Sequence, residues 1–157
     1  GEYIASPYAL VWEDENYYLI AHSERHGLTH YRVDKMTKLA ISDKPRVITD
    51  EARALDLSSY GKTVFGMFAG SPEPVKLRFD NSLAGVVIDR FGKDVMLTPE
   101  DGGCFTVSAQ IVLSPVFYGW LASFADRAEL LLPEHARQDF AAQCRKTLKQ
   151  YNRKYNL

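Results

Sequence analysis

Residues 22–38 concentrate the side chains whose types and spacing could support chemistry. Histidines recur at every fourth position, at His22, His26 and His30, and on a helix this spacing would line one side and could ligate a metal ion. Gly27 and the strand pattern around it instead predict a hairpin, which places the three imidazoles across a turn. We therefore predict no metal site here.

The same segment is locally basic. Only Glu24 and Asp34 oppose its four cations, which are Arg25, Arg32, Lys35 and Lys38. In a chain of net charge −1, such a cluster favours a local anion site over a uniformly basic surface. A solvated sheet surface is the alternative interpretation, because charged residues on one strand are usually exposed to water.

The predicted strand at residues 28–33 fixes which of these side chains share a face, because alternate side chains point to opposite faces. We expect His30, Arg32 and Asp34 to face outward. Tyr31 and Val33 would then face the core. The result would be a ladder of polar groups on one side of the hairpin.

Two adjacent tyrosines, Tyr17 and Tyr18, add aromatic rings to this hairpin, and neighbours in a strand point to opposite faces. If Tyr18 shares the outward face with His22, its ring stands in the same hairpin as Arg32. An aromatic face beside cationic donors suits stacked bases and phosphates. Packing of both rings in the core is the alternative.

A second basic cluster closes the chain, where no acidic residue follows Asp139. Its members could contact nucleic acid, or could complement the dipole of a C-terminal helix and stay solvated. Both interpretations remain open from the sequence. The cluster consists of Arg145, Lys146, Lys149, Arg153 and Lys154.

Composition and motifs limit the class of protein. The chain has 157 residues, 46% apolar and 25% charged, as in an ordinary folded domain. It contains no GxSxG turn, no phosphate-binding GxxxxGK loop, no GxGxxG and no HExxH. Carboxylates such as Asp89, Asp94, Glu100 and Asp101 lie near predicted helix ends and turns, where capping and solvation explain them. We therefore predict a non-enzymatic protein without a cofactor.

Cysteine usage and hydropathy bear on the compartment. Cys104 and Cys144 are forty positions apart and have no metal-ligand spacing, so neither a disulfide framework nor a zinc site is indicated. This usage fits a reducing cytoplasm. Residues 102–125 carry no formal charge, but their apolar period changes from that of a strand to that of a helix. We therefore predict no membrane span and a cytoplasmic location.

The first half of the chain predicts four short strands, at residues 8–12, 17–21, 28–33 and 39–41. This meander predicts a small barrel, because closure protects strand edges. Asp56 can cap a helix, one side of which carries Leu57, Tyr60, Val64 and Phe68. Two prolines within residues 70–74 stop any helix and predict a domain boundary there.

The second half predicts strands at 75–79, 95–98, 105–112 and 128–132, and helices at 83–91, from Ser114-Pro115 and from Glu134. In the last helix an apolar residue recurs at every fourth position: Ala136, Phe140, Cys144 and Leu148. The order βαββαβ is that of the ferredoxin-like, split βαβ arrangement. We predict an α+β fold, in which a small β-barrel is followed by a ferredoxin-like βαββαβ domain with a C-terminal helix.

Several of these runs carry a family resemblance. YYL at 17–19, followed by HYRVDKM at 30–36, resembles the signature of the WYL domain, whose name comes from a Trp-Tyr-Leu run; Tyr17 replaces the tryptophan. Residues 74–151, with LRF at 77–79 and WLASF at 120–124, resemble the WCX extension that follows WYL in bacterial regulators. The resemblance covers nearly the whole chain.

The resemblance implies an Sm-like, SH3-type barrel with a connecting helix as a ligand-sensing domain at 1–70, and a WCX-like α/β dimerisation domain at 75–157. It implies a single-stranded nucleic acid or nucleotide effector in a basic groove, at the matching positions Tyr18, His22, His30, Arg32 and Lys35. Many members carry an arginine at the place of Thr29. Promoter DNA would bind only through an N-terminal winged helix-turn-helix, which lies outside this sequence, and the protein would be a homodimer.

Two functional hypotheses follow. The first is the ligand-sensing and dimerisation region of a bacterial transcriptional regulator that binds a phosphate-bearing effector in the barrel. The second is a dimerisation or protein-interaction module without a small ligand. The first requires that the guanidinium of Arg32 is not buried in a permanent ion pair and that the imidazoles of His22 and His30 lie near it.

Overall fold

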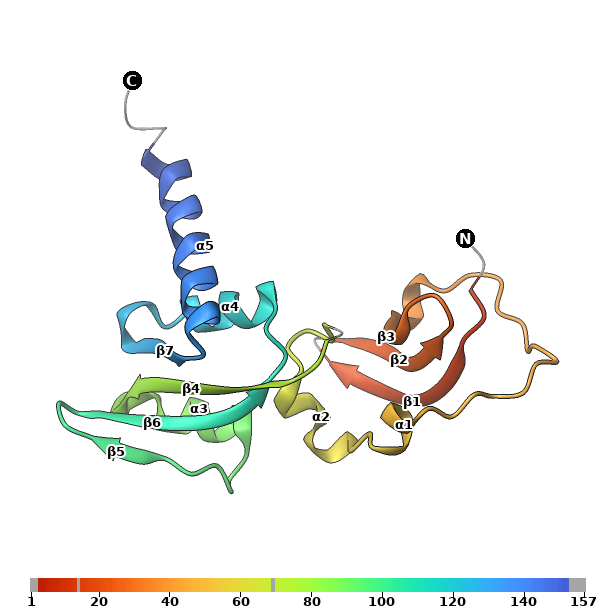
Figure 1. The fold of residues 1–157 in the computed structure, drawn as a ribbon, viewed down its shortest axis with the longest axis horizontal. Coiled ribbons are helices and arrows are strands. Elements are labelled where there is room, and N and C mark those ends of the chain that lie inside the picture. Colours follow the sequence, from red (N-terminus) through yellow and green to blue (C-terminus); the bar gives the residue numbers. More distant parts are fainter. Residues whose placement is uncertain (1–2, 14, 69, 153–157) are drawn as a thin grey trace. The chain divides into compact units, whose positions relative to one another are not determined.

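The computed structural model describes residues 3–13, 15–68 and 70–152. The chain divides into two compact units, Gly1–Ser71 and Pro72–Leu157. Each unit contains a sheet of its own, with three strands in the first and four in the second (Figure 1). Within the described residues, no helix is long and apolar enough to cross a membrane.

The first unit is built on an antiparallel meander in the order β1-β2-β3. Its strands are β1 (Ser6–Glu13), β2 (Asn16–Ser23) and β3 (Gly27–Arg32). Both predicted hairpins are present, since Glu13 pairs with Asn16 and Ser23 pairs with Gly27. Gly27 has a φ of 62°, a left-handed conformation that glycine adopts without a steric cost.

The predicted fourth strand at residues 39–41 is wrong, and the described residues form no closed barrel. After β3 the chain turns through a 3-10 helix, Val33–Lys35, and continues without regular structure. Leu39 and Ile41 are 77% and 101% exposed. The apolar run that predicted a strand is real, but strand formation needs a neighbouring strand edge, which residues 39–41 do not find.

Short helices complete the first unit. They are α1 (Asp50–Arg53), which the sequence did not predict, and α2 (Leu57–Thr63). The helix predicted to continue to Phe68 ends earlier, because Gly66 and Met67 have φ angles of 58° and 54°, which no α-helix accommodates. The buried apolar side chains described in this unit are Ile20, Ala21, Val64, Phe65 and Met67.

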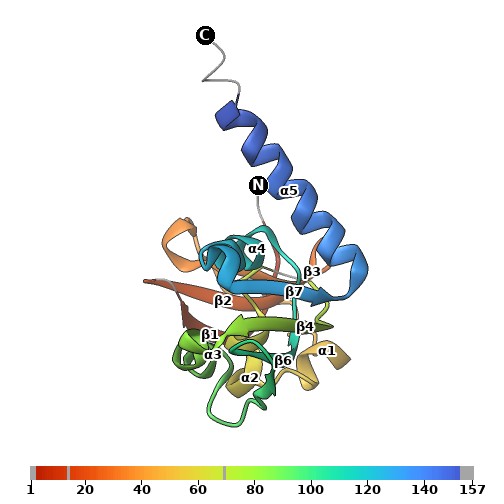
Figure 2. The ribbon, with the colours of Figure 1, turned by 90° about the vertical axis from the view of Figure 1, so that its left-hand side faces the viewer.

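The second unit has the predicted order βαββαβ followed by a terminal helix. All pairings in its sheet are antiparallel, in the order β5-β6-β4-β7 (Figure 1), and Figure 2 shows β4 between β6 and β7. This order is the split βαβ arrangement. The elements are β4 (Glu73–Asp80), α3 (Ala84–Phe91), β5 (Thr98–Glu100), β6 (Cys104–Ile111), α4 (Pro115–Ala122), β7 (Ala128–Leu132) and α5 (Glu134–Asn152), with short 3-10 turns at Asn81–Leu83 and Ala125–Arg127.

The start of α4 and the end of α3 lie where the sequence predicted them, whereas the strand predicted after α3 begins later than expected. The Ser114 hydroxyl accepts a hydrogen bond from the Phe117 amide at 3.1 Å and so caps α4. Gly92 ends α3 with a φ of 95°. The strand predicted at residues 95–98 begins later, at Thr98, because the Val95 amide donates to the Gly92 carbonyl and continues the turn.

The core of the second unit lies on one face of its sheet. Alternate residues of β4 are buried, and Phe79 at its end is fully buried. The ring of Trp120 in α4 lies 6.1 Å from Phe79 and 5.8 Å from Phe91 in α3. Both helices therefore pack against the same face of the sheet.

Candidate effector site on the first sheet

Strand register brings four of the five predicted site residues onto one face of the first sheet. Tyr18 of β2 lies opposite Arg32 of β3, and Ile20 lies opposite His30. His22 follows two positions along β2, opposite Leu28. Because side chains alternate, Tyr18, His22, His30 and Arg32 all belong to this face. The Tyr18–Arg32 pair is the direct cross-strand contact of the set.

Arg32 is held by two partners on the same side of the hairpin. Its Nε and one terminal nitrogen donate to the two carboxylate oxygens of Asp34, at 3.0 and 2.9 Å. The same terminal nitrogen donates to Asn16 Oδ1 at 2.7 Å. Hydrogen bonding to Asp34 raises the pKa of Arg32, and Arg32 holds the pKa of Asp34 below its usual range. These contacts involve three of the five guanidinium N–H groups.

The ion pair lies at the surface rather than in the core. The side chains of Arg32 and Asp34 are 39% and 47% exposed. Exposed pairs are weak, because water solvates each charge nearly as well as the partner does. An incoming phosphate can therefore exchange with Asp34 as the partner of Arg32.

His30 is half-buried against α2 rather than open to solvent, so this part of the predicted polar ladder is wrong. Its Nε2 lies 2.6 Å from the hydroxyl of Tyr60 in α2, and the two rings are 5.6 Å apart. Burial lowers the pKa of His30 below 6.5, an effect that the Met67 backbone partly offsets. Burial also raises the pKa of Tyr60. Near neutral pH, His30 is therefore an uncharged hydrogen-bonding group rather than a cation for phosphate.

Lys35 and His22 lie at opposite ends of the face. Lys35, in the turn after β3, is 72% exposed, and its ammonium lies 3.5 Å from Asp34. Asp34 thus holds Arg32 and Lys35 together. His22 is half-buried, with Ser6 and Leu28 as its strand partners. The structure brings together Tyr18, Arg32 and Lys35, and leaves His22 apart from them by strand register.

The opposite face of the same sheet carries an exposed apolar patch. Trp12 and Tyr17 are cross-strand partners whose rings meet edge to face at 4.7 Å, and they are 58% and 51% exposed. Leu10, beside them on β1, is 59% exposed. Thr29 also belongs to this face, since it pairs with Ala21. Of the two adjacent tyrosines, Tyr17 is thus the more exposed, and Tyr18 is half-buried.

Sequence reasoning missed the residues that hold the site in place. The sequence places Asn16 in a turn, Asp34 among the outward-facing polar residues and Tyr60 on a helix face, without a role at the site. Asn16 becomes a partner of Arg32 only through the β2–β3 register. Tyr60 reaches His30 across thirty positions of sequence. Among the described residues, no group of three His, Cys, Asp or Glu side chains could hold a metal ion, and both cysteines are free thiols.

The fold defines a protein of two small domains, one built on a β-meander and one with the split βαβ order. Comparison with protein families identifies both: the WYL domain matches residues 1–41, and the WCX domain matches residues 71–148. The chain therefore carries a WYL domain followed by a WCX domain. The curated proteins contain no match to its sequence.

Two solved structures are similar to the chain. Proteasome accessory factor B/C (PafBC) of Arthrobacter aurescens is 18% identical, with a TM-score of 0.46, over 94% of this chain and 22% of that one. A CRISPR Cas-related protein is 14% identical, with a TM-score of 0.35, over 98% of this chain and 44% of that one. The chain spans less than half the length of either protein.

Proposed function

We propose that the chain is the ligand-sensing and dimerisation region of a bacterial transcriptional regulator, and that the first unit binds a single-stranded nucleic acid or nucleotide. The binding surface is the part of the β2–β3 face formed by Tyr18, Arg32 and Lys35. The requirement that both imidazoles lie near Arg32 is not met for His22, which strand register leaves apart, and His30 contacts Tyr60 instead of contributing a cation. The proposal therefore rests on Tyr18, Arg32 and Lys35 alone. The second unit supplies the homodimer contact, and the protein works in a reducing cytoplasm.

The cross-strand pair of Tyr18 and Arg32 carries this proposal. A half-buried ring next to a guanidinium offers its accessible part for stacking with a base and offers hydrogen bonds for a phosphate. Lys35 adds a second cation on the same side of Asp34. Signalling requires that the ligand binds one arrangement of the regulator more tightly than another, because equal affinities shift no equilibrium.

The test is titration of this chain with a fluorescent oligothymidine, followed by anisotropy at several salt concentrations. Arg32→Ala removes a cation that neutralises a phosphate, so binding weakens and the log-log salt slope falls by about 0.7. Tyr18→Leu removes a stacking surface worth about 1–3 kcal/mol per base, so binding weakens by roughly 5- to 150-fold with the slope unchanged.

The matched control is Arg53→Ala. Arg53 is also an exposed arginine of the first unit in an ion pair with an aspartate, Asp50, at 3.1 Å, but it lies on α1. The variant removes the same charge as Arg32→Ala, but from a residue outside the proposed surface. Its binding curve should therefore follow that of the unaltered chain. If Arg32→Ala and Arg53→Ala bind equally, the proposed site is wrong.

A protein-interaction module without a small ligand is the second candidate. The exposed Leu10, Trp12 and Tyr17 favour it, because clustered apolar side chains on a sheet face are typical of protein contacts. Both candidates allow a dimer, so the oligothymidine titration separates them, and light scattering reports whether the dimer forms without the oligonucleotide. A dimer that forms without the oligonucleotide, together with binding curves that are flat in every variant, supports the second.

A further inference from the structure

Charge is segregated along this chain. Fourteen basic and twenty acidic residues precede Phe140, whereas residues 140–157 contain five basic residues and no acidic one. The net charge of −1 therefore hides a segment of +5 attached to a body of −6. Such asymmetry is typical of a segment that contacts a polyanion or an anionic surface.

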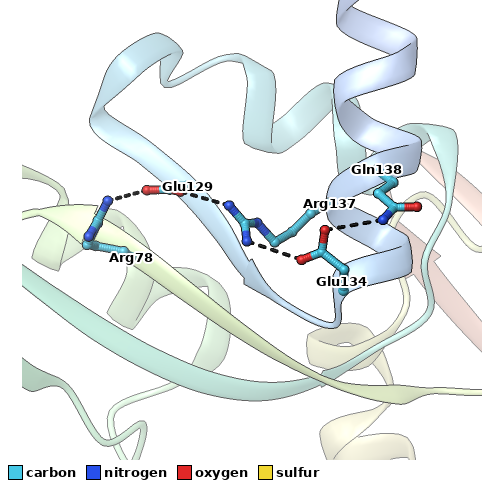
Figure 3. A network of polar contacts seen from close by, with 5 residues as sticks. All are labelled: Arg78, Glu129, Glu134, Arg137 and Gln138. Atoms are coloured by element: carbon cyan, nitrogen blue, oxygen red, sulfur yellow. Dashed lines mark hydrogen bonds and ion pairs between the residues drawn. The ribbon is translucent and has the colours of Figure 1, made fainter.

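The first turn of α5 is anchored by a charged network that uses the neighbouring carboxylates (Figure 3). Arg78 of β4 donates to Glu129 of β7. Arg137 of α5 lies 3.7 Å from Glu129 and 3.2 Å from Glu134, and Gln138 donates to Glu134 at 3.3 Å. Glu129 and Glu134 thus already have cationic or amide partners, and the basic part of the helix follows them in the sequence.

The second half of α5 extends past the other elements of its unit (Figures 1 and 2). Every side chain from Gln143 to Asn152 is exposed. Arg145, Lys146 and Lys149 form no ion pair with any residue that the structure describes, so we call them the basic face of α5. Three unpaired cations within two turns create a local positive potential.

The basic face is separate from the apolar stripe of the same helix. At about 100° per residue, the three cations fall within an arc of about 100°, and the stripe lies on the opposite side. The stripe, which lines a shallow hollow with Ala122, consists of Phe140, Cys144, Leu148 and Tyr151. One side of the helix is thus positively charged without large apolar groups, and the other is apolar without charge.

This separation decides between anionic partners. A helix that lies in a membrane surface buries its apolar side, which here would turn Lys146 away from the anionic headgroups. A single strand binds through aromatic rings interleaved with cations, but Phe140 and Tyr151 lie on the side away from the cations. The phosphate backbone of a duplex needs only cations on a rigid surface.

The geometry points to the basic face of α5 as a second nucleic-acid site, one that binds the phosphate backbone of duplex DNA. It is independent of the effector surface on the first sheet and makes no contact that reads sequence. Its role is to add sequence-independent affinity for DNA, because backbone contacts strengthen and orient binding without specifying bases.

The experiment measures anisotropy of a labelled duplex of arbitrary sequence with this chain at increasing salt. Replacing all three cations, as Arg145→Gln/Lys146→Gln/Lys149→Gln, should weaken binding and lower the salt slope by about 0.9 for each phosphate that is no longer neutralised, up to roughly 2.7. Circular dichroism checks that α5 remains helical. Arg32→Ala should leave duplex binding unchanged, so a failure here is distinguishable from a failure of the effector site.

The matched control is Lys44→Gln/Lys62→Gln/Lys93→Gln, which removes the same charge from exposed lysines that are not part of α5. Equal salt slopes for the two triple variants would overturn the proposal, since net charge alone would then explain binding. Binding to vesicles of phosphatidylcholine and phosphatidylserine that disappears only in the α5 variant, with no duplex binding, would also overturn it in favour of a membrane.

Discussion

Asp34 competes with any anion for Arg32, and this competition can be measured. Asp34→Asn breaks the bidentate ion pair, which leaves Arg32 with Asn16 as its hydrogen-bond partner and removes a negative charge from beside Lys35. We predict that Asp34→Asn binds oligothymidine several-fold more tightly than the unaltered chain, as measured by anisotropy titration. Asp50→Asn, which frees Arg53 on α1 in the same way, is the control and should leave affinity unchanged.

The environment of His30 makes stability depend on pH. Burial lowers its pKa in the folded chain below 6.5, so the unfolded chain binds the proton more readily. The contribution of neutral His30 to stability is therefore complete above pH 6.5. It is lost as pH falls from the unfolded pKa towards the lower folded pKa. We predict that urea midpoints of His30→Gln fall less between pH 7.5 and pH 5 than those of the unaltered chain. Parallel curves would contradict this account.

The hydrogen bond between His30 and Tyr60 is the contact that ties α2 to β3. Tyr60→Phe removes it and leaves a half-buried imidazole without that partner. We predict a loss of about 1–2 kcal/mol in the free energy of unfolding, measured by urea denaturation at pH 7.5. A loss below about 0.5 kcal/mol would mean that water replaces the tyrosine hydroxyl.

At the scale of elements, the sequence predicted best what local chemistry determines. Strand β7 and the start of α4 lie where an apolar run and the Ser114-Pro115 step placed them. Residues 39–41 also form an apolar run but have no pairing edge, so long-range contacts decided against a strand. The candidate site shows the same difference between local and long-range determinants. The basic hairpin could be predicted from the sequence, whereas the contact between His30 and Tyr60 could not.

The cap of α4 tests the local part of this argument. Ser114 is buried, and its hydroxyl is the cap hydrogen-bond acceptor for the Phe117 amide. We predict that Ser114→Ala lowers the free energy of unfolding by about 1–2 kcal/mol, measured by urea denaturation. Ser123→Ala, at the exposed other end of the same helix, should cost less than about 0.5 kcal/mol.

At the scale of the molecule, the two units have unequal cores. Among the described residues, five buried apolar side chains belong to Gly1–Ser71 and fifteen to Pro72–Leu157. Apolar burial is the main favourable term in folding, so the second unit should be the more stable one. The first unit, with its long exposed segment at residues 37–48, should open first.

Each unit contains one tryptophan, so the order of unfolding can be measured directly. Trp12→Phe leaves Trp120 as a reporter of the second unit, and Trp120→Phe leaves Trp12 as a reporter of the first. Because the second unit buries three times as many apolar side chains, we predict a higher urea midpoint for the Trp12→Phe reporter than for the Trp120→Phe reporter, provided that Trp120→Phe keeps a cooperative transition.

Hydrogen exchange of the unaltered chain provides a check without substitution, with faster exchange in β1–β3 than in β4 and β6. Coincident transitions and equal exchange would mean that the chain folds as one cooperative unit, in which effector binding at Arg32 would stabilise the WCX domain as strongly as the WYL domain.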